Sequence, residues 1–358
     1  MNWRHFFGWT FVVLLVIIEL AGAACLVLAY RYNRSLEEPV SVRPTDTMAT
    51  DTLVVVPEPV AVEFSIVVAG DAMMHMPQYY AALQPDGTCS FDTCFQAIVP
   101  VLARYDAAVV NLETTLPGSG YSGFPRFGAP DAFAEALQRT GFGIFLMANN
   151  HCCDKDRRGM LRTLSVLDSL GIQHLGVYRD VQERDSLYPY VIDHQGLRVA
   201  LLNATYGTNG LPVPAGMCVN MLDTAAIRTD IARAKEQQAD VIIMMPHWGE
   251  EYHRQPMPGQ RQLARWLLSH GIDHIVGSHP HVIEPVETVE DSLGRQHVVA
   301  YSLGNLISSQ QQRERSESLL LGLHFRKDTT GTILTACDTI LTRVRREANR
   351  QPILEVVE

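Results

Sequence analysis

The feature that most constrains the fold is a repeated alternation of short apolar runs with longer amphipathic stretches, beginning near Val60. The apolar runs are rich in Val, Ile, Leu and Met and are bounded by Gly, Pro or polar residues, which is typical of buried strands. They cover residues 64–70, 107–112, 143–148, 198–203, 241–246, 274–277 and 297–302, and two more follow Leu319. Strands that alternate with helices predict βαβ units around a largely parallel, buried sheet, and therefore an α/β fold.

Helical patterns fill the intervals between these runs. They cover residues 91–105, 130–140, 158–171, 224–238 and 259–271. Gly141, Gly171 and Gly271 stand where three of these helices should end, because glycine adopts the left-handed conformation that terminates a helix.

Composition excludes one class of partner. The chain of 358 residues is 47% hydrophobic and 19% charged, which is globular material with enough length for a large core. Its formal net charge is −10, and no run rich in Lys or Arg is present. Nucleic acid is therefore not expected as the main partner.

The first residues predict a membrane anchor. Residues 9–30 are almost wholly apolar, with Glu19 as the only acidic residue, and a bilayer needs about 20 such residues. A cleaved signal peptide is the alternative, since Ala21–Ala24 are small residues, but the apolar run continues past them. We predict a segment at 1–8, a transmembrane anchor at 9–30, an extended tether at 31–60, a folded domain at 61–345 and a tail at 346–358.

Polar residues follow almost every predicted strand. In chain order they are Asp71, Glu113, Asn150 with His151, His247, and His279 with His281. Each one alone has a structural explanation, for example as a helix cap. Because open α/β sheets bind ligands at the carboxyl ends of their strands, the set predicts one composite site. Nitrogen and oxygen ligands together suit Zn, Mn or Fe, and their number favours two ions bridged by a carboxylate over one.

Pro280 predicts how two of these histidines converge. A residue before proline is pushed toward extended geometry, and extended backbone points residues two apart to the same side. His279 and His281 are therefore expected to face one centre.

The seven cysteines form no C-x-x-C pair, so a structural zinc knuckle is not expected. Cys89 and Cys94 flank a short loop and could form a disulfide if the domain lies outside the cytoplasm. The adjacent Cys152 and Cys153 could bind a soft metal or be redox-active, but buried small side chains are the favoured interpretation.

Several separate motifs, in a fixed order, carry a family resemblance. They are GDAMMHMPQ, NLETTL, GYSGFPRFGAPD, ANNHCCDKDRRGMLRTL, YGTNG, HWGEEY, GSHPHVIEPVE and YSLGNLISSQ, and they span roughly residues 62–325. The chain resembles the CapA family of poly-gamma-glutamate capsule synthesis proteins, which is similar to calcineurin-like metallophosphoesterases. The resemblance implies a four-layer α/β/β/α sandwich after the anchor.

The resemblance also implies two metal positions. Asp71 and His281 would ligate the first ion, and Glu113 would bridge the two. The second ion would be bound by the remaining members, Asn150, His247 and His279.

Further roles follow from the same resemblance. His151, with Asn150, would be catalytic, acting as an acid or stabilising a phosphate. His75, Glu251 and Asn305 are possible ligands or supports of ligands. Phosphoesterases carry Asp-x-His at the first strand, whereas His75 here lies four residues after Asp71, and Glu113 stands where they usually carry Asp. Arg126 is either a substrate-binding residue or a member of a structural ion pair.

These observations predict a single-pass membrane protein with an extracytoplasmic domain and a metal-dependent, hydrolase-like site. It would act in synthesis, export or processing of an anionic cell-surface polymer such as poly-gamma-glutamate, with a polymer synthase or exporter as partner. Two alternatives remain: a general phosphoesterase acting on envelope phosphodiesters, and a non-catalytic partner that binds the polymer for a synthase.

Overall fold

The computed structural model describes residues 61–346 and 350–357. The predicted anchor and tether lie outside the described residues. Within the described ranges, no helix is long and apolar enough to cross a membrane.

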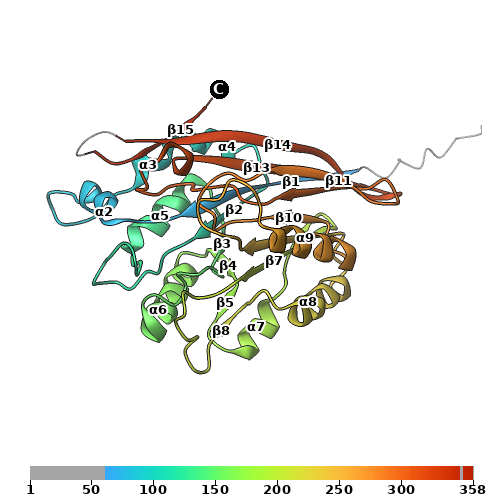
Figure 1. Ribbon diagram of the computed structural model, residues 1–358, viewed down its shortest axis with the longest axis horizontal. Coiled ribbons are helices and arrows are strands. Elements are labelled where there is room, and N and C mark those ends of the chain that lie inside the picture. The colour runs from blue at the N-terminus through green and yellow to red at the C-terminus, as the bar shows by residue number, and fades with distance from the viewer. Residues whose placement is uncertain (1–60, 347–349, 358) are drawn as a thin grey trace, which may run out of the picture. The chain divides into compact units, whose positions relative to one another are not determined.

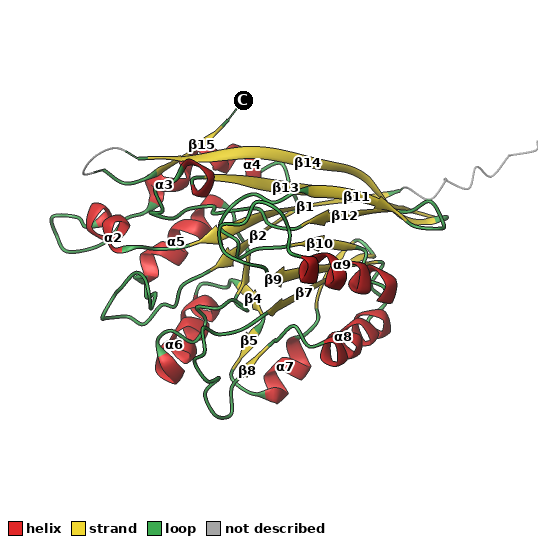
Figure 2. Ribbon diagram, in the orientation of Figure 1, coloured by secondary structure: helices red, strands yellow, loops and turns green. Residues whose placement is uncertain are grey.

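The strands form two large sheets (Figures 1 and 2). In the first, the order is β15-β14-β13-β1-β2-β3-β4. Its strands are β1 (Val62–Ala72), β2 (Ala107–Leu112), β3 (Ile144–Leu146), β4 (Gln173–Leu175), β13 (Glu317–Asp328), β14 (Gly331–Arg345) and β15 (Ile353–Val356). Strands β1 to β4 are parallel, whereas β13, β14 and β15 pair antiparallel.

The second sheet has the order β11-β12-β10-β9-β7-β6. Its strands are β6 (Tyr190–His194), β7 (Leu197–Thr205), β9 (Val241–His247), β10 (His274–Val276), β11 (Val286–Glu290) and β12 (Gln296–Ala300). The four central strands are parallel, and the edge strands β6 and β11 are antiparallel to their neighbours. A small ribbon pairs β5 (Val177–Tyr178) with β8 (Cys218–Val219).

The helices lie between the strands in sequence. They are α2 (Met76–Ala82), α3 (Asp92–Phe95), α4 (Val99–Leu102), α5 (Asp131–Thr140), α6 (Asp156–Ser169), α7 (Val181–Leu187), α8 (Thr224–Glu236) and α9 (Pro258–His270), with short 3₁₀ turns η1 (Gln96–Ile98) and η2 (Arg313–Arg315). Gly141 and Gly271 follow α5 and α9 with φ of 122° and 105°, as expected for helix stops.

Strand β1 shows how the layers pack. Alternate residues of a strand face opposite sides. Ile66 and Val68 belong to the core that joins the two sheets and continues to α8 and α9. Val67 and Ala69 belong to the core under α5 and α6. The packing order is therefore helices, first sheet, second sheet and helices, and each fully buried aliphatic side chain contributes about 1.5–3 kcal/mol.

The predicted mixed α/β fold is confirmed, with two corrections. The expectation of one largely parallel sheet is wrong, because the strands divide between two sheets that both carry antiparallel strands at an edge. A pattern of apolar runs identifies strands but does not say which sheet each one joins. The single helix predicted at 91–105 is also wrong: it is broken into α3, η1 and α4. Pro100 lies in the first turn of α4, where a missing N–H is tolerated, and ends any helix continuing into it.

A close contact between glycines fixes the end of β1. A Cβ on Gly70 would lie 1.9 Å from the carbonyl oxygen of Gly304, so only glycine fits there. The backbone N–H of Asp71 donates to the same oxygen at 3.0 Å, and Ile307 N–H donates to the carbonyl of Asp71 at 3.2 Å. The SLGN segment after β12 thereby holds Asp71 in place.

Candidate metal centre

Two fully buried carboxylates lie side by side at the ends of β1 and β2. Asp71 pairs in register with Asn111, and Glu113 N–H donates to the carbonyl of Ala72 at 3.0 Å. Both acidic side chains have no exposed surface. Burial, reinforced by the charge of Asp71, raises the pKa of Glu113 well above its ordinary value. A bound cation would reverse this effect and stabilise both carboxylates in their charged form.

Histidines from the second sheet face this pair. His247 ends β9, and His281 follows β10. His281 Nδ1 lies 3.0 Å from Asp71 Oδ2, and its Nε2 lies 3.7 Å from Glu113 Oε1. His247 Nε2 lies 3.8 Å from the same Glu113 oxygen. Glu113 Oε1, which has no hydrogen-bond partner, therefore stands between two imidazoles.

Asn150, which follows β3, completes the contacts of His247. Its Oδ1 lies 2.8 Å from His247 Nε2, and its Nδ2 donates to Asn209 Oδ1 at 3.2 Å. On the other side of the ring, His247 Nδ1 lies 2.9 Å from Ser278 Oγ. Ser278 thus holds the ring at Nδ1, as a supporting residue does for a ligating histidine, while Nε2 faces Asn150 and Glu113.

The possible ligand atoms fall into three groups, each within 4.8 Å. Two of these groups share Glu113, which is the position expected to bridge two ions. A third group combines Glu251 with two histidines. The groups are Asp71, Glu113 and His281; Glu113, His247 and His279; and Glu251, His279 and His281. The donors fit divalent metal ions, and His279 Nδ1, a second buried atom without a partner, supports this.

Burial sets the protonation state of these histidines. It lowers the pKa of His247 well below its ordinary value, with a further contribution from the neighbouring imidazoles. It also lowers the pKa of His279 to about 4. The neutral ring is the form that binds a metal, so the site is prepared for ligation at neutral pH.

The extended geometry predicted for His279 is wrong. Its φ is 102°, and that of His281 is 59°, values that non-glycine residues rarely adopt. The two rings still face the same centre, with centroids 5.9 Å apart. The proline preference is overridden because Asp71 Oδ2 accepts from His279 N–H at 3.3 Å, and strained backbone of this kind is typical of functional sites.

His151 lies beside the ligand groups and outside them. Its Nδ1 is 2.6 Å from Asp154 Oδ2, and the edge of Phe127 packs on its ring at 4.6 Å between centroids. Together with His281, it lines a cavity of about 210 Å³. Asp154 received no role in the sequence analysis, although its position three residues after His151 in the NNHCCD motif is a usable signal.

The predicted supporting residues have different surroundings. His75 lines the same cavity and accepts from Ser309 N–H at 3.3 Å, but it belongs to none of the three ligand groups. Burial lowers its pKa to about 4. Asn305 Nδ2 donates to the carbonyl of His281 at 3.3 Å, so Asn305 supports the histidine turn from behind.

Arg126 is not among the residues that line this cavity. It is exposed and lies 3.9 Å from Asp156, which is itself 79% exposed. Such a surface pair contributes at most about 1 kcal/mol. The structure brings Arg126 into an ion pair, and its role toward substrate remains a prediction.

Asn111 is a neighbour of the site that the sequence analysis left without a role. Its Nδ2 donates to Asp71 Oδ1 at 2.8 Å and lies 3.4 Å from both Glu113 Oε2 and His247 Nδ1. Its place two residues before Glu113 on the same strand face would have indicated this.

None of the cysteines in the described part of the chain belongs to a ligand group. Cys89 and Cys94 are both free, so the disulfide considered for them is absent from the described structure. Cys152 and Cys153 are buried with sulfurs 3.8 Å apart, which agrees with small side chains filling the core beneath Asn150.

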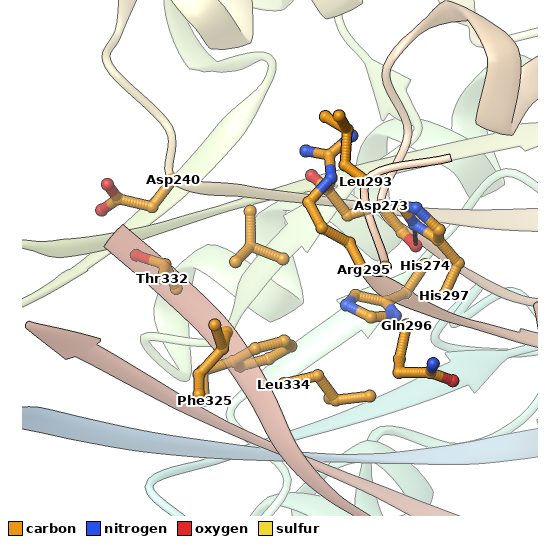
Figure 3. A pocket seen from close by; sticks show the side chains of 13 residues that line it. Asp240, Asp273, His274, Leu293, Arg295, Gln296, His297, Phe325, Thr332 and Leu334 are labelled. Carbon is orange, nitrogen blue, oxygen red and sulfur yellow. Dashed lines mark hydrogen bonds between the residues drawn. The ribbon is translucent and has the colours of Figure 1, made fainter. Parts of the chain in front are cut away.

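A second cavity, of about 410 Å³, lies at the opposite ends of the strands (Figure 3). Val241 and His274, the first residues of β9 and β10, line it, whereas His247 ends β9 at the candidate metal centre. Figure 3 also shows Phe325 and Leu334 in its wall.

Comparison with solved structures concerns the fold. A Staphylococcus aureus protein described as a 5′-nucleotidase has a TM-score of 0.50 and 14% identity, covering 80% of this chain and 55% of that one. A calcineurin-like phosphoesterase from Bacillus subtilis has a TM-score of 0.47 and 12% identity, covering 78% of this chain and 90% of that one. The mixed α/β fold is similar to that of the Staphylococcus aureus protein.

The family model for the bacterial capsule synthesis protein PGA_cap matches residues 65–310, and the chain belongs to this family. The PGA biosynthesis protein CapA of Bacillus subtilis is 28% identical over 255 residues, covering 67% of this chain and 63% of the relative. The capsule biosynthesis protein CapA of Bacillus anthracis is 26% identical over 256 residues, covering 68% of this chain and 60% of the relative. The similarity thus spans about three fifths of these curated relatives.

Proposed function

We propose that this chain is a membrane-anchored CapA-type protein whose α/β/β/α domain works outside the cytoplasm on an anionic cell-surface polymer such as poly-gamma-glutamate. Its reaction would be a metal-dependent hydrolysis that serves synthesis, export or processing of the polymer. The observation that carries the proposal is the pair of ligand groups that share the buried, partnerless oxygen of Glu113.

The residues of the chain would divide the work as follows. Asp71, Glu113 and His281 would hold one divalent ion, of Mn, Zn or Fe, and the group of Glu113, His247 and His279, with Asn150, would hold a second. When bound, such ions polarise a phosphoryl or carbonyl oxygen as Lewis acids.

His151 is the proposed proton donor. Its contact with Asp154 at 2.6 Å fixes the ring through Nδ1 and leaves Nε2 for the substrate. In the proposed step, Nε2–H of the protonated ring would donate to the leaving oxygen.

The location is proposed from the sequence and from the relatives. Residues 9–30 support an anchor, and the relatives' names refer to capsule and PGA biosynthesis. A chain held at the membrane by a tether is suited to work beside a polymer synthase or exporter, the partner we propose.

The test uses the purified full chain in detergent, loaded with Mn²⁺ or Zn²⁺. Hydrolysis of bis(p-nitrophenyl) phosphate and of γ-linked glutamate oligomers is measured for the wild type and for His247→Ala. We expect turnover of at least one substrate and its loss in the variant. Turnover of the phosphodiester without binding of the glutamate oligomer would replace the proposal with a general phosphoesterase. Metal and polymer binding without turnover would replace it with a non-catalytic partner.

A further inference from the structure

One arginine beside the candidate metal centre has no acidic partner. The turn η2 carries Arg313 and Arg315, and Arg313 Nε lies 3.1 Å from Glu317 Oε1. The guanidinium carbon of Arg315 instead lies 3.4 Å from the ring centroid of Tyr252. Among the described residues, no carboxylate forms an ion pair with Arg315, which is only partly exposed. Its charge is therefore available to a ligand.

Arg315 is fixed relative to the histidine turn through its backbone. Asn305 Nδ2 donates to the carbonyl of Arg315 at 3.0 Å and to the carbonyl of His281 at 3.3 Å. One amide group thus ties the arginine to a predicted metal ligand.

The side chain of Arg315 is fixed relative to the same turn through Tyr252. The N–H of Tyr252 donates to the carbonyl of Pro280 at 2.8 Å. Its ring centroid lies 6.1 Å from that of His281. The backbone and the side chain of Arg315 are therefore both connected, through Asn305 and Tyr252, to the segment that presents His279 and His281.

Tyr252 connects the arginine to the cavity. Tyr252, Gln310, His151 and His281 are among the residues that line the cavity of about 210 Å³. Gln310 Nε2 lies 3.4 Å from the Tyr252 hydroxyl, and 39% of the tyrosine is exposed. A substrate that fills the cavity and extends past Tyr252 would come near Arg315.

The stacked geometry favours recognition of an oxyanion. The tyrosine occupies one face of the guanidinium and stabilises it by about 0.5–2 kcal/mol, while the in-plane N–H groups stay free. These groups match the two oxygens of a carboxylate or a phosphate. An arginine that is already held in place loses less side-chain entropy when it binds such a group.

We propose that Arg315, stacked on Tyr252, binds a second anionic group of the substrate, a carboxylate or phosphate that lies beyond the reacting group. This arginine would select substrates with several negative charges over simple monoanions. The inference rests on the proposed function, because it concerns the same cavity.

The experiment measures the affinity of the Mn²⁺-loaded full chain for two fluorescein-labelled probes, a γ-linked glutamate decamer and an inorganic polyphosphate, by fluorescence anisotropy. Arg315→Gln is compared with Arg313→Gln, which removes the same charge from the same turn. We expect Arg315→Gln to weaken binding about tenfold or more, as for loss of one charge-assisted contact. Arg313→Gln should change it less than about twofold, because its charge is already paired. The probe that loses more affinity identifies carboxylate or phosphate as the group bound.

Two further variants separate recognition from folding. Tyr252→Phe keeps the ring and should bind as the wild type does, whereas Tyr252→Ala should weaken binding as Arg315→Gln does. Metal content should be unchanged in Arg315→Gln. Equal effects of the two arginine variants on both probes would overturn the role of Arg315. Failure of the wild type to bind either probe would instead overturn the proposed function.

Discussion

The two ends of the parallel strands both carry histidines and carboxylates, but they use them differently. At the amino ends, Asp240 accepts from Arg198 N–H at 2.8 Å and Asp273 accepts from Ile242 N–H at 2.8 Å. His274 Nδ1 accepts from Val298 N–H at 3.1 Å. At the carboxyl ends, by contrast, Glu113 Oε1 has no partner at all.

The difference separates structural polar groups from functional ones. A buried polar group that satisfies a backbone N–H contributes to folding and needs no ligand. A buried group left without a partner costs about 1–3 kcal/mol, which a folded protein accepts where a bound species will supply the missing contact. At the carboxyl ends, the atoms without partners belong to Glu113 and His279, which are members of the ligand groups, so this is the end where we expect metal ions.

The largest effect is expected from Glu113→Gln. Both ligand groups that contain Glu113 lose an anionic oxygen, so metal content measured by mass spectrometry should fall for both ions together. Glu284→Gln is the matched control, because Glu284 is also a buried carboxylate, hydrogen-bonded to Gln260 at 2.9 Å, and belongs to none of the ligand groups. A Glu113→Gln protein with full metal content would contradict the bridging role.

A smaller effect is expected from Asn111→Ala. Asn111 orients Asp71 through a 2.8 Å hydrogen bond, and loss of such a supporting contact typically lowers metal affinity about 10–100-fold. Thr332→Ala alters the cavity at the opposite strand ends and should leave the affinity unchanged. Titration with Mn²⁺, followed by calorimetry, measures both. Equal affinity of the two variants for Mn²⁺ would contradict the claim that only the carboxyl ends of the strands bind metal.

The next effect in size is expected in the pH dependence of stability, through His279. Burial lowers the pKa of His279 from 6.5 to about 4, so the unfolded chain binds a proton that the folded metal-free protein does not. The stability that the neutral His279 contributes is fully present above pH 6.5. As the pH falls from 6.5 toward 4, the free energy of unfolding decreases by about 3 kcal/mol because of this residue.

His279→Gln should remove this part of the acid sensitivity, measured by urea unfolding of metal-free protein at pH 6.5 and pH 4. His274→Gln removes a histidine whose pKa is lowered to about 3, also by burial, and should change the acid profile without changing metal content. If His279→Gln and the wild type are equally sensitive to acid, then the loss of stability at low pH does not come from His279.

The smallest effect is expected from Asp273→Asn at the amino ends of the strands. The amide oxygen can still accept from Ile242 N–H, so unfolding free energy should change by only about 1 kcal/mol. Metal content and turnover should match those of the wild type. A loss of either would show that the two ends are coupled.

The sequence predicts the parallel strands other than β4, and the residues that follow them, because a buried strand has a strong apolar signal and its end is marked by a polar residue. Asp71, Glu113 and His247 were located in this way, and the structure brings them together. The strands β4, β6 and β11 were not predicted, because they lie at sheet edges and are only partly buried, which weakens the apolar signal.

Tertiary contacts explain the remaining errors. Pro280 alone favours an extended residue before it, but the hydrogen bond from His279 N–H to Asp71 links residues 208 positions apart. Asn111 and Arg315 likewise acquire their surroundings from segments that no local pattern connects to them. Local rules therefore locate the predicted ligands, and long-range contacts decide their geometry.

The contact between Gly70 and Gly304 has a consequence for the order of folding. The carbonyl that holds Asp71 belongs to a segment synthesised more than two hundred residues later, and contacts so distant in sequence form slowly. A nascent chain lacking the SLGN segment would have β1 but no fixed Asp71. Metal capture would then be a late event, completed only when nearly the whole domain has left the ribosome.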